Sequence, residues 1–323
     1  MADLARAVGV SKSTVSRAFS RPDMLNPETV DRIAEVAARI GYRPNRAARA
    51  LSTGRHGNIG MVVPDIANPF FPPLIRAGQV EADRSDFCVF LGNSDEDPEQ
   101  EDRLVSHFLS QVSGLLLIAS RLDEDRIRAY ADLCPLVLVN RDVAGIPRIL
   151  IDSGPAVAEA VRHLHSLGHE RIIYVSGPPK SWSEQERRAA AKAEAERLGM
   201  SLTVVPVTKP AYETGLELAP PVLDSGATAA VAFDDITAHG LMTGLSHRGV
   251  AIPKDFSLVG CDDVLGARTN PPMTTVTTSS EEAGRCAIAM LLALIAGAVP
   301  QGTLRTISTR LVLRGTTGPA PQR

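Results

Sequence analysis

The chain has 323 residues with 34 basic and 37 acidic side chains, and its formal net charge is −3. This length suggests two or three domains, and 44% hydrophobic with 22% charged residues excludes a disordered chain. No apolar run approaches the roughly 18 residues that a membrane span needs, and the N-terminus lacks the profile of a signal peptide. We therefore expect a cytoplasmic protein without a membrane partner.

The near-neutral total hides an uneven distribution of charge. Residues 1–55 carry 10 basic and 5 acidic side chains, a net charge of +5, which leaves −8 for the rest of the chain. A basic head on an acidic body is typical of a nucleic-acid-binding module joined to a globular domain.

The chain opens with two short helical patterns joined by a glycine. In residues 3–8, Leu4, Ala5 and Val8 fall on one face, and Gly9 suits the left-handed turn that ends a helix. A second helix is predicted over residues 12–19. Its N-cap and buried stripe are Ser11, Val15, Ala18 and Phe19.

A third helix is predicted to begin at Asn26 as N-cap with Pro27 at the first helical position, and to end at Gly41. Its inner face is expected to comprise Val30, Ile33, Ala34, Ala37 and Ile40. Two short helices joined by a tight turn and backed by a third form the helix-turn-helix arrangement. We assign residues 1–44 to this all-α DNA-binding domain.

The second helix exposes donors and short hydroxyls, which can reach base edges and phosphates in the major groove of double-stranded DNA. The predicted DNA contacts are Ser11, Lys12, Ser13, Thr14, Ser16 and Arg17. The alternative is a three-helix bundle with a merely solvated face. The charge of +5 and the helix order disfavour it.

Residues 10–18 (VSKSTVSRA) and 41–45 (GYRPN) resemble the LacI/GalR family of bacterial transcription regulators, and the similarity runs nearly end to end. The resemblance implies a helix-turn-helix domain plus a two-lobed α/β effector domain of the type I periplasmic-binding-protein fold. It also implies a homodimer on a palindromic operator. The family has a few more residues before the first helix, so we expect the start at Met1 to be truncated or misassigned.

Residues 45–57 connect the predicted bundle to the body. The strong helix formers here are too few for a stable isolated helix, which needs about 12–15 residues. The resemblance implies a hinge helix that orders on DNA beside its dimer mate and inserts a leucine into the minor groove. The DNA contacts predicted on this basis are Asn45, Arg46, Ala48 and Leu51. A plain linker is the disfavoured alternative, because it does not account for this leucine.

From residue 58 to 318, apolar strands alternate with amphipathic helices in two similar series, which predicts two lobes that each contain a parallel sheet. The predicted strands are 59–63, 87–91, 115–118, 136–139, a short one ending at Asp152, 172–175, 202–205, 229–233 and 258–261. The predicted helices are 74–82, 104–109, 156–167, 183–198 and 237–248. We place one lobe at 58–153 plus 277–301, the other at 154–276 plus 302–318, and a tail at 319–323.

Ligands of such sheets bind beyond the carboxyl ends of the strands, so the residues that follow those ends are candidates. The predicted effector site is Phe70, Phe71, Arg141, Asp152, Trp182, Arg187, Asp234 and Asp262. Carboxylates accept from hydroxyls, a guanidinium donates to them and aromatic faces cover C–H groups, so this set suits a sugar-like effector. The resemblance implies that Arg187 and Asp262 are pocket residues and that Asp234 replaces an asparagine.

Each candidate has a structural alternative. Arg187 can pair with Glu184 or Glu186 on an exposed helix, and the three aromatic residues can be packing residues. Asp234 or Asp235 can be an N-cap, the role that we favour for Asp235. An aspartate at position 234 predicts a neutral or amine-bearing effector rather than an anionic one.

The sequence contains no motif for nucleotide-dependent, metalloprotease or serine-hydrolase chemistry, so no enzyme is expected. The four cysteines are far apart, mostly in apolar stretches, and we expect buried thiols without zinc. His163, His165 and His169 favour surface or capping roles over metal binding. We predict no metal and no cofactor.

Two functions stay open. The first is a transcription repressor controlled by a small effector, as a homodimer because the tail carries no apolar heptads. The second is a transport receptor with the same two-lobed body, against which residues 1–52 and the missing signal peptide argue. Whether the effector acts as inducer or co-repressor is left open.

Overall fold

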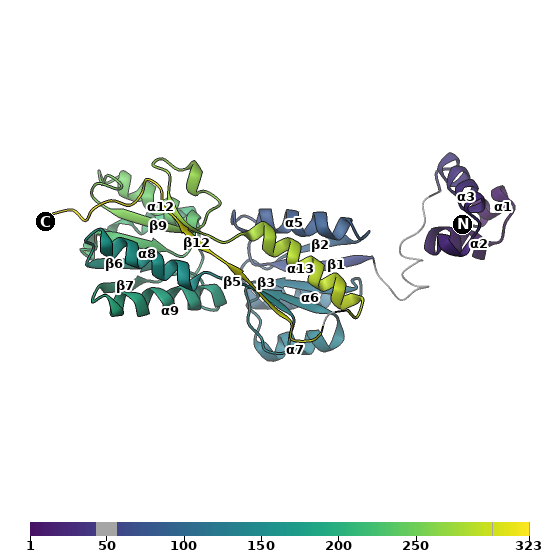
Figure 1. The fold of residues 1–323 in the computed structure, drawn as a ribbon, viewed down its shortest axis with the longest axis horizontal. Helices are drawn as coiled ribbons and strands as arrows, with labels where there is room; N and C mark the ends of the chain where they lie inside the picture. The colour runs from purple at the N-terminus through teal and green to yellow at the C-terminus, as the bar shows by residue number, and fades with distance from the viewer. Residues whose placement is uncertain (43–56, 299, 323) are drawn as a thin grey trace. The chain divides into compact units, whose positions relative to one another are not determined.

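The computed structural model describes residues 1–42, 57–298 and 300–322. The chain forms two compact units, Met1–Gly57 and Asn58–Arg323 (Figure 1). Within the described ranges, no helix is long and apolar enough to cross a membrane.

The first unit has the helix-turn-helix arrangement that the sequence predicts. Its elements are α1 (Ala2–Val8), α2 (Lys12–Ser20), a 3-10 helix η1 (Pro22–Met24) and α3 (Pro27–Arg39). Gly9 ends α1 with a left-handed backbone at φ 75°. The Ser11 hydroxyl caps α2 by accepting from Thr14 N–H at 3.0 Å, and the Asn26 side chain caps α3 by accepting from Glu28 N–H at 3.0 Å.

The core of the first unit draws apolar side chains from all three helices. Its buried members are Leu4, Ala5, Val8, Val15, Ala18, Ile33, Val36 and Ala37. The predicted inner face of α3 is partly wrong, because Ala34 and Ile40 are exposed. The buried stripe instead runs from Ile33 to Val36 and Ala37, the spacing that one face of a helix requires.

The first lobe of the second unit is built on a parallel sheet with strand order β11-β5-β4-β3-β1-β2. Its strands are β1 (Asn58–Val63), β2 (Cys88–Asn93), β3 (Gly114–Ile118), β4 (Leu136–Val139), β5 (Arg148–Asp152) and β11 (Leu304–Ser308). Its helices are α5 (Phe71–Asp83), α6 (Pro98–Leu109), α7 (Glu124–Leu133) and α13 (Ser280–Ile295).

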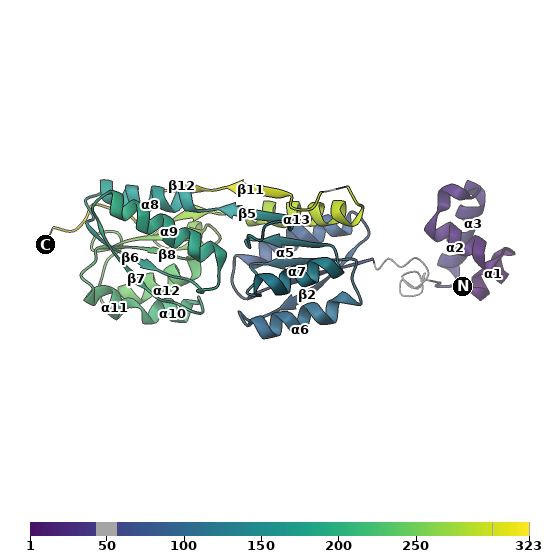
Figure 2. The same cartoon turned by 90° about the horizontal axis from the view of Figure 1, so that it is seen from below.

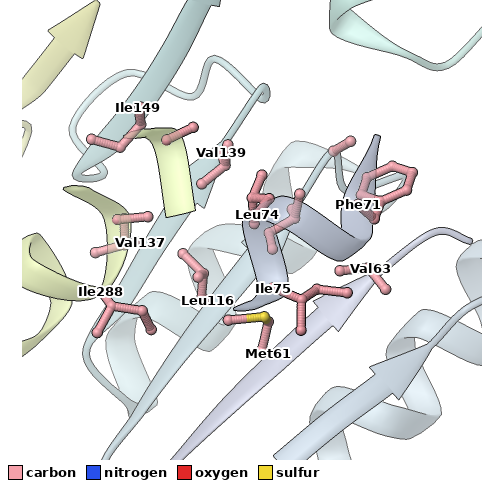
Figure 3. Packing of buried hydrophobic residues seen from close by; sticks show 14 of the residues in the cluster. Met61, Val63, Phe71, Leu74, Ile75, Leu116, Val137, Val139, Ile149 and Ile288 are labelled. Carbon is pink, nitrogen blue, oxygen red and sulfur yellow. The ribbon is translucent and has the colours of Figure 1, made fainter. Parts of the chain in front are cut away.

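Successive strand side chains face opposite sides of this sheet, so each face has its own core. Met61, Leu116 and Val137 pack against α5 and α13 (Figure 3). Val62 and Leu117 pack on the other face, against α6 and α7. This arrangement explains why the central strands read as continuous apolar runs in the sequence.

The second lobe has a sheet with strand order β12-β10-β9-β8-β6-β7, in which only the β10–β12 pair is antiparallel. The strands are β6 (Arg171–Val175), β7 (Ser201–Val205), β8 (Ala229–Ala232), β9 (Ser257–Asp262), β10 (Thr274–Thr277) and β12 (Arg310–Val312). The helices are α8 (Gly154–Ser166), α9 (Trp182–Arg197), α10 (Tyr212–Glu217), α11 (Ala219–Asp224), α12 (Asp235–Ser246) and the 3-10 helix η2 (Gly266–Arg268). α8 and α9 cover one face, and α11 and α12 cover the other.

In the described part of the chain, three connections join the lobes, after β5, after β10 and between β11 and β12. Figure 2 shows β11 and β12 passing in succession from the first lobe to the second. Because β11 pairs with β5, residues 304–308 belong to the first lobe, and their placement in the second lobe was wrong. The tail also begins later than predicted, since Ala320 N–H donates to Leu167 C=O at 2.8 Å.

Two predictions about burial are also wrong. β2 is an edge strand, so Cys88 is exposed and Leu91 is 41% exposed. His169 is not on the surface: it is 1% exposed, its ring bonds to the hydroxyls of Thr228 and Ser257 at 2.8 and 3.0 Å, and its backbone N–H donates to Leu164 C=O at the end of α8 at 3.2 Å. Among the described residues, no group of histidine, cysteine or carboxylate side chains is arranged to hold a metal ion.

Candidate functional site

The residues of α2 predicted to contact DNA lie mainly on an exposed surface. The exposed members are Ser11, Lys12, Ser13, Ser16 and Arg17, while Thr14 is partly buried. The Ser11 hydroxyl also lies 2.7 Å from Ser13 Oγ and 2.8 Å from Thr14 Oγ1, so it helps to order the start of the helix. The predicted hinge contacts Asn45, Arg46, Ala48 and Leu51 lie outside the described residues.

A cavity lies between the two lobes of the second unit, and we call it the interlobe cavity. The first lobe contributes Asn68, Phe70, Phe71, Glu96, Ala119, Arg121 and Asn140 to its lining; the second contributes Ser181, Ser183, Arg187, Pro210, Phe233 and Asp262. The structure thus brings together four of the eight predicted effector residues, which are Phe70, Phe71, Arg187 and Asp262. Its volume of about 40 Å³ is far below the roughly 300 Å³ of the smallest ligand pockets, so the cavity is too small for a drug-sized ligand in this arrangement of the lobes.

Arg187 is the central polar group of the cavity wall. Its Nε donates to Ser153 Oγ at 2.9 Å, its Nη1 to Phe233 C=O at 2.5 Å and its Nη2 to Asp262 Oδ1 at 3.2 Å. The side chains of Arg187 and Asp262 are 4% and 6% exposed. The alternative of an exposed pair with Glu184 or Glu186 is therefore wrong, because Arg187 faces inward from α9.

Glu184 is itself buried, and it bonds to the loop after β6 instead of to Arg187. Its Oε2 accepts from Tyr174 O–H at 2.9 Å and from Gly177 N–H at 2.8 Å. Burial raises the pKa of the Glu184 carboxyl, and these two hydrogen bonds partly oppose the shift. Glu184 therefore holds the loop after β6 in place, next to the start of α9.

Three residues that line the cavity have a strained backbone directly at the end of a strand. Ala119 follows β3 with φ 48°, Asn140 follows β4 with φ 51°, and Asp262 ends β9 with φ 110°. Residues other than glycine adopt such angles rarely, and they concentrate at functional sites. Burial raises the pKa of Asp262 well above its usual value, and the positive charge of Arg187 offsets part of the shift.

Asp234 is the N-cap of α12 and also a contact between the lobes. Its Oδ1 accepts from Thr237 N–H at 3.0 Å, and its Oδ2 accepts from Asn68 Nδ2 of the first lobe at 3.1 Å. Burial raises the pKa of the Asp234 carboxyl. Asp234 does not line the cavity itself, but it orients Asn68, which does.

The prediction that Asp235 is an N-cap is wrong, because α12 begins one residue earlier than that role requires. Asp235 is fully buried and binds a different part of the chain. Its Oδ2 accepts from the N–H groups of Val264 and Leu265 at 3.0 and 3.1 Å, and its Oδ1 accepts from Thr275 O–H at 2.6 Å. It thereby fixes the loop that follows Asp262.

Asp235 makes the stability of the second unit depend on pH. Burial, reinforced by the nearby charges of Asp234 and Asp263, raises its pKa to about 6, whereas an unfolded aspartate has a pKa of about 3.9. The folded state therefore binds the proton of the Asp235 carboxyl more tightly than the unfolded state does. The protonated Asp235 carboxyl thus stabilises the folded state fully below about pH 4, and this stabilisation is lost as the pH rises through about 6. The Asp235→Asn side chain is neutral at every pH. As the pH rises from about 4 to about 7, the free energy of unfolding of this variant should therefore increase by about 3 kcal/mol relative to that of wild type.

Urea unfolding of both proteins across this pH range measures the difference. A difference in unfolding free energy that stays constant with pH would show that Asp235 keeps an ordinary pKa in the folded protein.

Three other predicted effector residues do not line the cavity. Arg141 is half-buried and donates from Nη2 to Leu122 C=O at 3.0 Å. Asp152 is exposed at the end of β5, and Trp182 is half-buried at the start of α9. Instead, Asn140 and Ser183 line the cavity, and Ser153 accepts a hydrogen bond from Arg187, so the residue next to each of these three lies closer to the cavity.

The predicted effector set lacks six polar residues that line the cavity: Asn68, Glu96, Arg121, Asn140, Ser181 and Ser183. Asn140 and Ser183 are 4% and 6% exposed, and Asn140 Oδ1 accepts from Ile151 N–H at 3.0 Å. A few polar side chains that line a cavity can fix the orientation of a ligand, and both of these residues lie in that position. Asn140 directly follows a strand and the strand-end rule could have found it; Ser183, inside a helix, gave no such signal.

Comparisons with known proteins assign both units. Residues 1–45 match the family "Bacterial regulatory proteins, lacI family", and residues 161–317 match "Periplasmic binding protein-like domain". Catabolite control protein A of Streptococcus mutans serotype c is 33% identical over 298 residues, covering 90% of this chain and 89% of that protein. The HTH-type transcriptional repressor CytR of Escherichia coli (strain K12) is 29% identical over 330 residues, covering 99% and 97%.

A solved structure extends the similarity to the whole fold. The Lac repressor dimer bound to operator and the anti-inducer ONPF superposes with a TM-score of 0.88 at 26% identity, covering 98% of each chain.

Proposed function

This chain belongs to the lacI family of bacterial regulatory proteins, and we propose on that premise that it is a repressor whose operator affinity is controlled by a sugar-like effector. The observation that carries the proposal is the buried Arg187–Asp262 pair in the wall of the interlobe cavity. Arginine and aspartate there can donate to and accept from hydroxyl groups, with Phe70 and Phe71 supplying apolar faces.

The pair is coupled to the connections between the lobes. Arg187 donates to Ser153 in the connection after β5, and Thr278 O–H, in the connection after β10, donates to Asp262 C=O at 3.2 Å. A ligand that binds the pair therefore acts on groups bonded to both connections and favours one arrangement of the lobes. A two-state coupling of this kind changes DNA affinity by typically about 1–3 kcal/mol.

The DNA side of the proposal rests on the exposed hydroxyls and cations of α2. In a homodimer, two copies of this helix enter successive major grooves of a palindromic operator. Lys12 and Arg17 supply phosphate and base contacts, and Leu51 of the hinge segment inserts into the minor groove. This basic helical unit favours a regulator over a transport receptor, which needs only the two lobes.

A thermal-shift screen of sugars, polyols, purines and their phosphates against the full chain tests the effector class, because a ligand that binds the folded state raises the melting temperature. We expect a neutral sugar or polyol to raise it. A screen in which only phosphorylated compounds do so would contradict the proposed class.

A further inference from the structure

The first-lobe wall of the interlobe cavity carries a charged pair that none of the predicted contacts includes. Glu96 lies after β2 and Arg121 after β3, and both line the cavity. Arg121 donates from Nε and Nη2 to the two carboxylate oxygens of Glu96, at 2.6 and 3.1 Å. This is a bidentate ion pair, and its side chains are only 5% and 16% exposed.

The guanidinium of Arg121 is held rigidly at the cavity wall. Its Nη1 donates to Ala119 C=O at 2.6 Å, and the Arg121 backbone N–H donates to the carboxylate of Glu101 at 2.8 Å. Glu101 is itself only 3% exposed. A group with this many fixed contacts presents its remaining N–H donors in one direction, as a recognition site requires.

The cavity therefore contains two arginines, each neutralised by one carboxylate. Arg187 and Asp262 form the pair on the second-lobe side, and Arg121 and Glu96 form the pair on the first-lobe side. Hydroxyl groups can donate to the carboxylates and accept from the guanidinium groups without breaking either pair. An anionic ligand finds no unpaired cation in the cavity and is repelled by two carboxylates. It can bind a guanidinium group only by breaking one of the buried ion pairs, which is unfavourable.

We propose that Glu96 and Arg121 are a second recognition pair, and that Glu96 selects neutral polyhydroxylated ligands over their acidic counterparts by neutralising Arg121. This inference rests on the proposed function of the interlobe cavity and names its ligand class more closely. Glu96 is the specificity-determining residue, since without it Arg121 is free to bind a carboxylate.

The position of the pair also suits a ligand contact that changes with lobe closure. Asp95, next to Glu96, accepts from Lys209 Nζ of the second lobe at 2.8 Å. Asp123, two residues after Arg121, lies 3.6 Å from Lys180 Nζ of the second lobe. The pair thus joins two loops that both touch the opposite lobe.

The test uses isothermal titration calorimetry on the full chain with matched probes: D-glucose with D-glucuronate, and D-galactose with D-galacturonate. Wild type should bind the neutral member of a pair more tightly. In Glu96→Gln the ratio of acid to neutral affinity should rise by about tenfold or more, because Arg121 gains a charged partner in the ligand. Glu99→Gln, an exposed carboxylate on α6, is the matched control and should leave the ratio unchanged.

Two further variants separate recognition from folding. The double variant Glu96→Gln/Arg121→Met should lose the gain for the acid, since the guanidinium is gone. Arg121→Gln leaves Glu96 without its partner and should shift preference from D-glucose toward the cationic D-glucosamine. The melting temperature of each unliganded protein checks that the fold is intact. If Glu96→Gln does not fold, the preference of Arg121→Gln between D-glucose and D-glucosamine tests the inference in its place.

The outcomes distinguish the inference from the proposed function. If wild type binds a neutral sugar but Glu96→Gln and Arg121→Gln leave both preferences unchanged, the inference is wrong and the proposed function stands. If wild type prefers the uronate, Glu96 does not neutralise Arg121 and the inference is again wrong. If wild type binds none of the probes, the inference is overturned, whereas the proposed function is decided by the thermal-shift screen.

Discussion

Replacing Arg187 with methionine is expected to abolish effector binding and to destabilise the second unit by about 3–5 kcal/mol. Arg187 is the only partner of the Asp262 carboxylate that the described residues provide, and both side chains are almost fully buried. Without the guanidinium, Asp262 must either keep an uncompensated charge or bind a proton. The hydrogen bonds to Ser153 and Phe233 C=O are lost as well.

Urea unfolding measures this cost, and Trp182 is a convenient fluorescence probe because it is the single tryptophan and lies on α9 with Arg187. The double variant Arg187→Met/Asp262→Asn is the control, since it leaves no buried charge unpaired. It should be more stable than Arg187→Met alone, although it too should not bind the effector. If Arg187→Met cost under about 1 kcal/mol, the pair would have to be solvated in solution.

Replacing Lys12 and Arg17 together with alanine is expected to weaken binding to random duplex DNA by at least about tenfold near 0.1 M salt. Both side chains are exposed on α2, so the helix-turn-helix core is left intact. Each lost phosphate contact reduces the slope of log affinity against log salt by about 0.9, so the double variant should lose up to about 2.

Fluorescence anisotropy across a salt series gives both quantities. Arg6→Ala is the matched control, because Arg6 is equally cationic and exposed but lies on α1, 3.6 Å from Asp3. An Arg6 variant with the same loss as the double variant would show that α2 has no special role. A flat salt dependence in wild type would contradict DNA binding altogether.

Local sequence patterns predicted most of the secondary structure because their causes are local. Ser11 and Asn26 were identified as N-caps from residue type and position, and the structure has both hydrogen bonds. The central strands were recognisable because they are buried on both faces. β11 was missed because its place in the first sheet depends on a crossing from α13, not on its own composition.

The sequence predicted at which edge of the sheets the candidate site lies, but not which side chains pair with one another there. Arg187 and Asp262 were found because polar residues at strand ends and at the start of the next helix converge there. Their pairing, across 75 positions of sequence, was not predictable from local patterns. The Glu96–Arg121 pair depends on the adjacency of β1 to both β2 and β3, which sequence order alone does not give. Which of two adjacent aspartates caps α12 was decided by a one-residue difference in where the helix begins.

A ligand in the interlobe cavity is expected to change the DNA affinity of the first unit. The most direct test selects a preferred palindromic duplex from a random pool and measures its affinity for the full chain with and without the strongest hit of the thermal-shift screen. Wild type should show a change of about 5- to 150-fold, and Arg187→Met should show none. Equal operator affinity for liganded and free wild type would contradict the account.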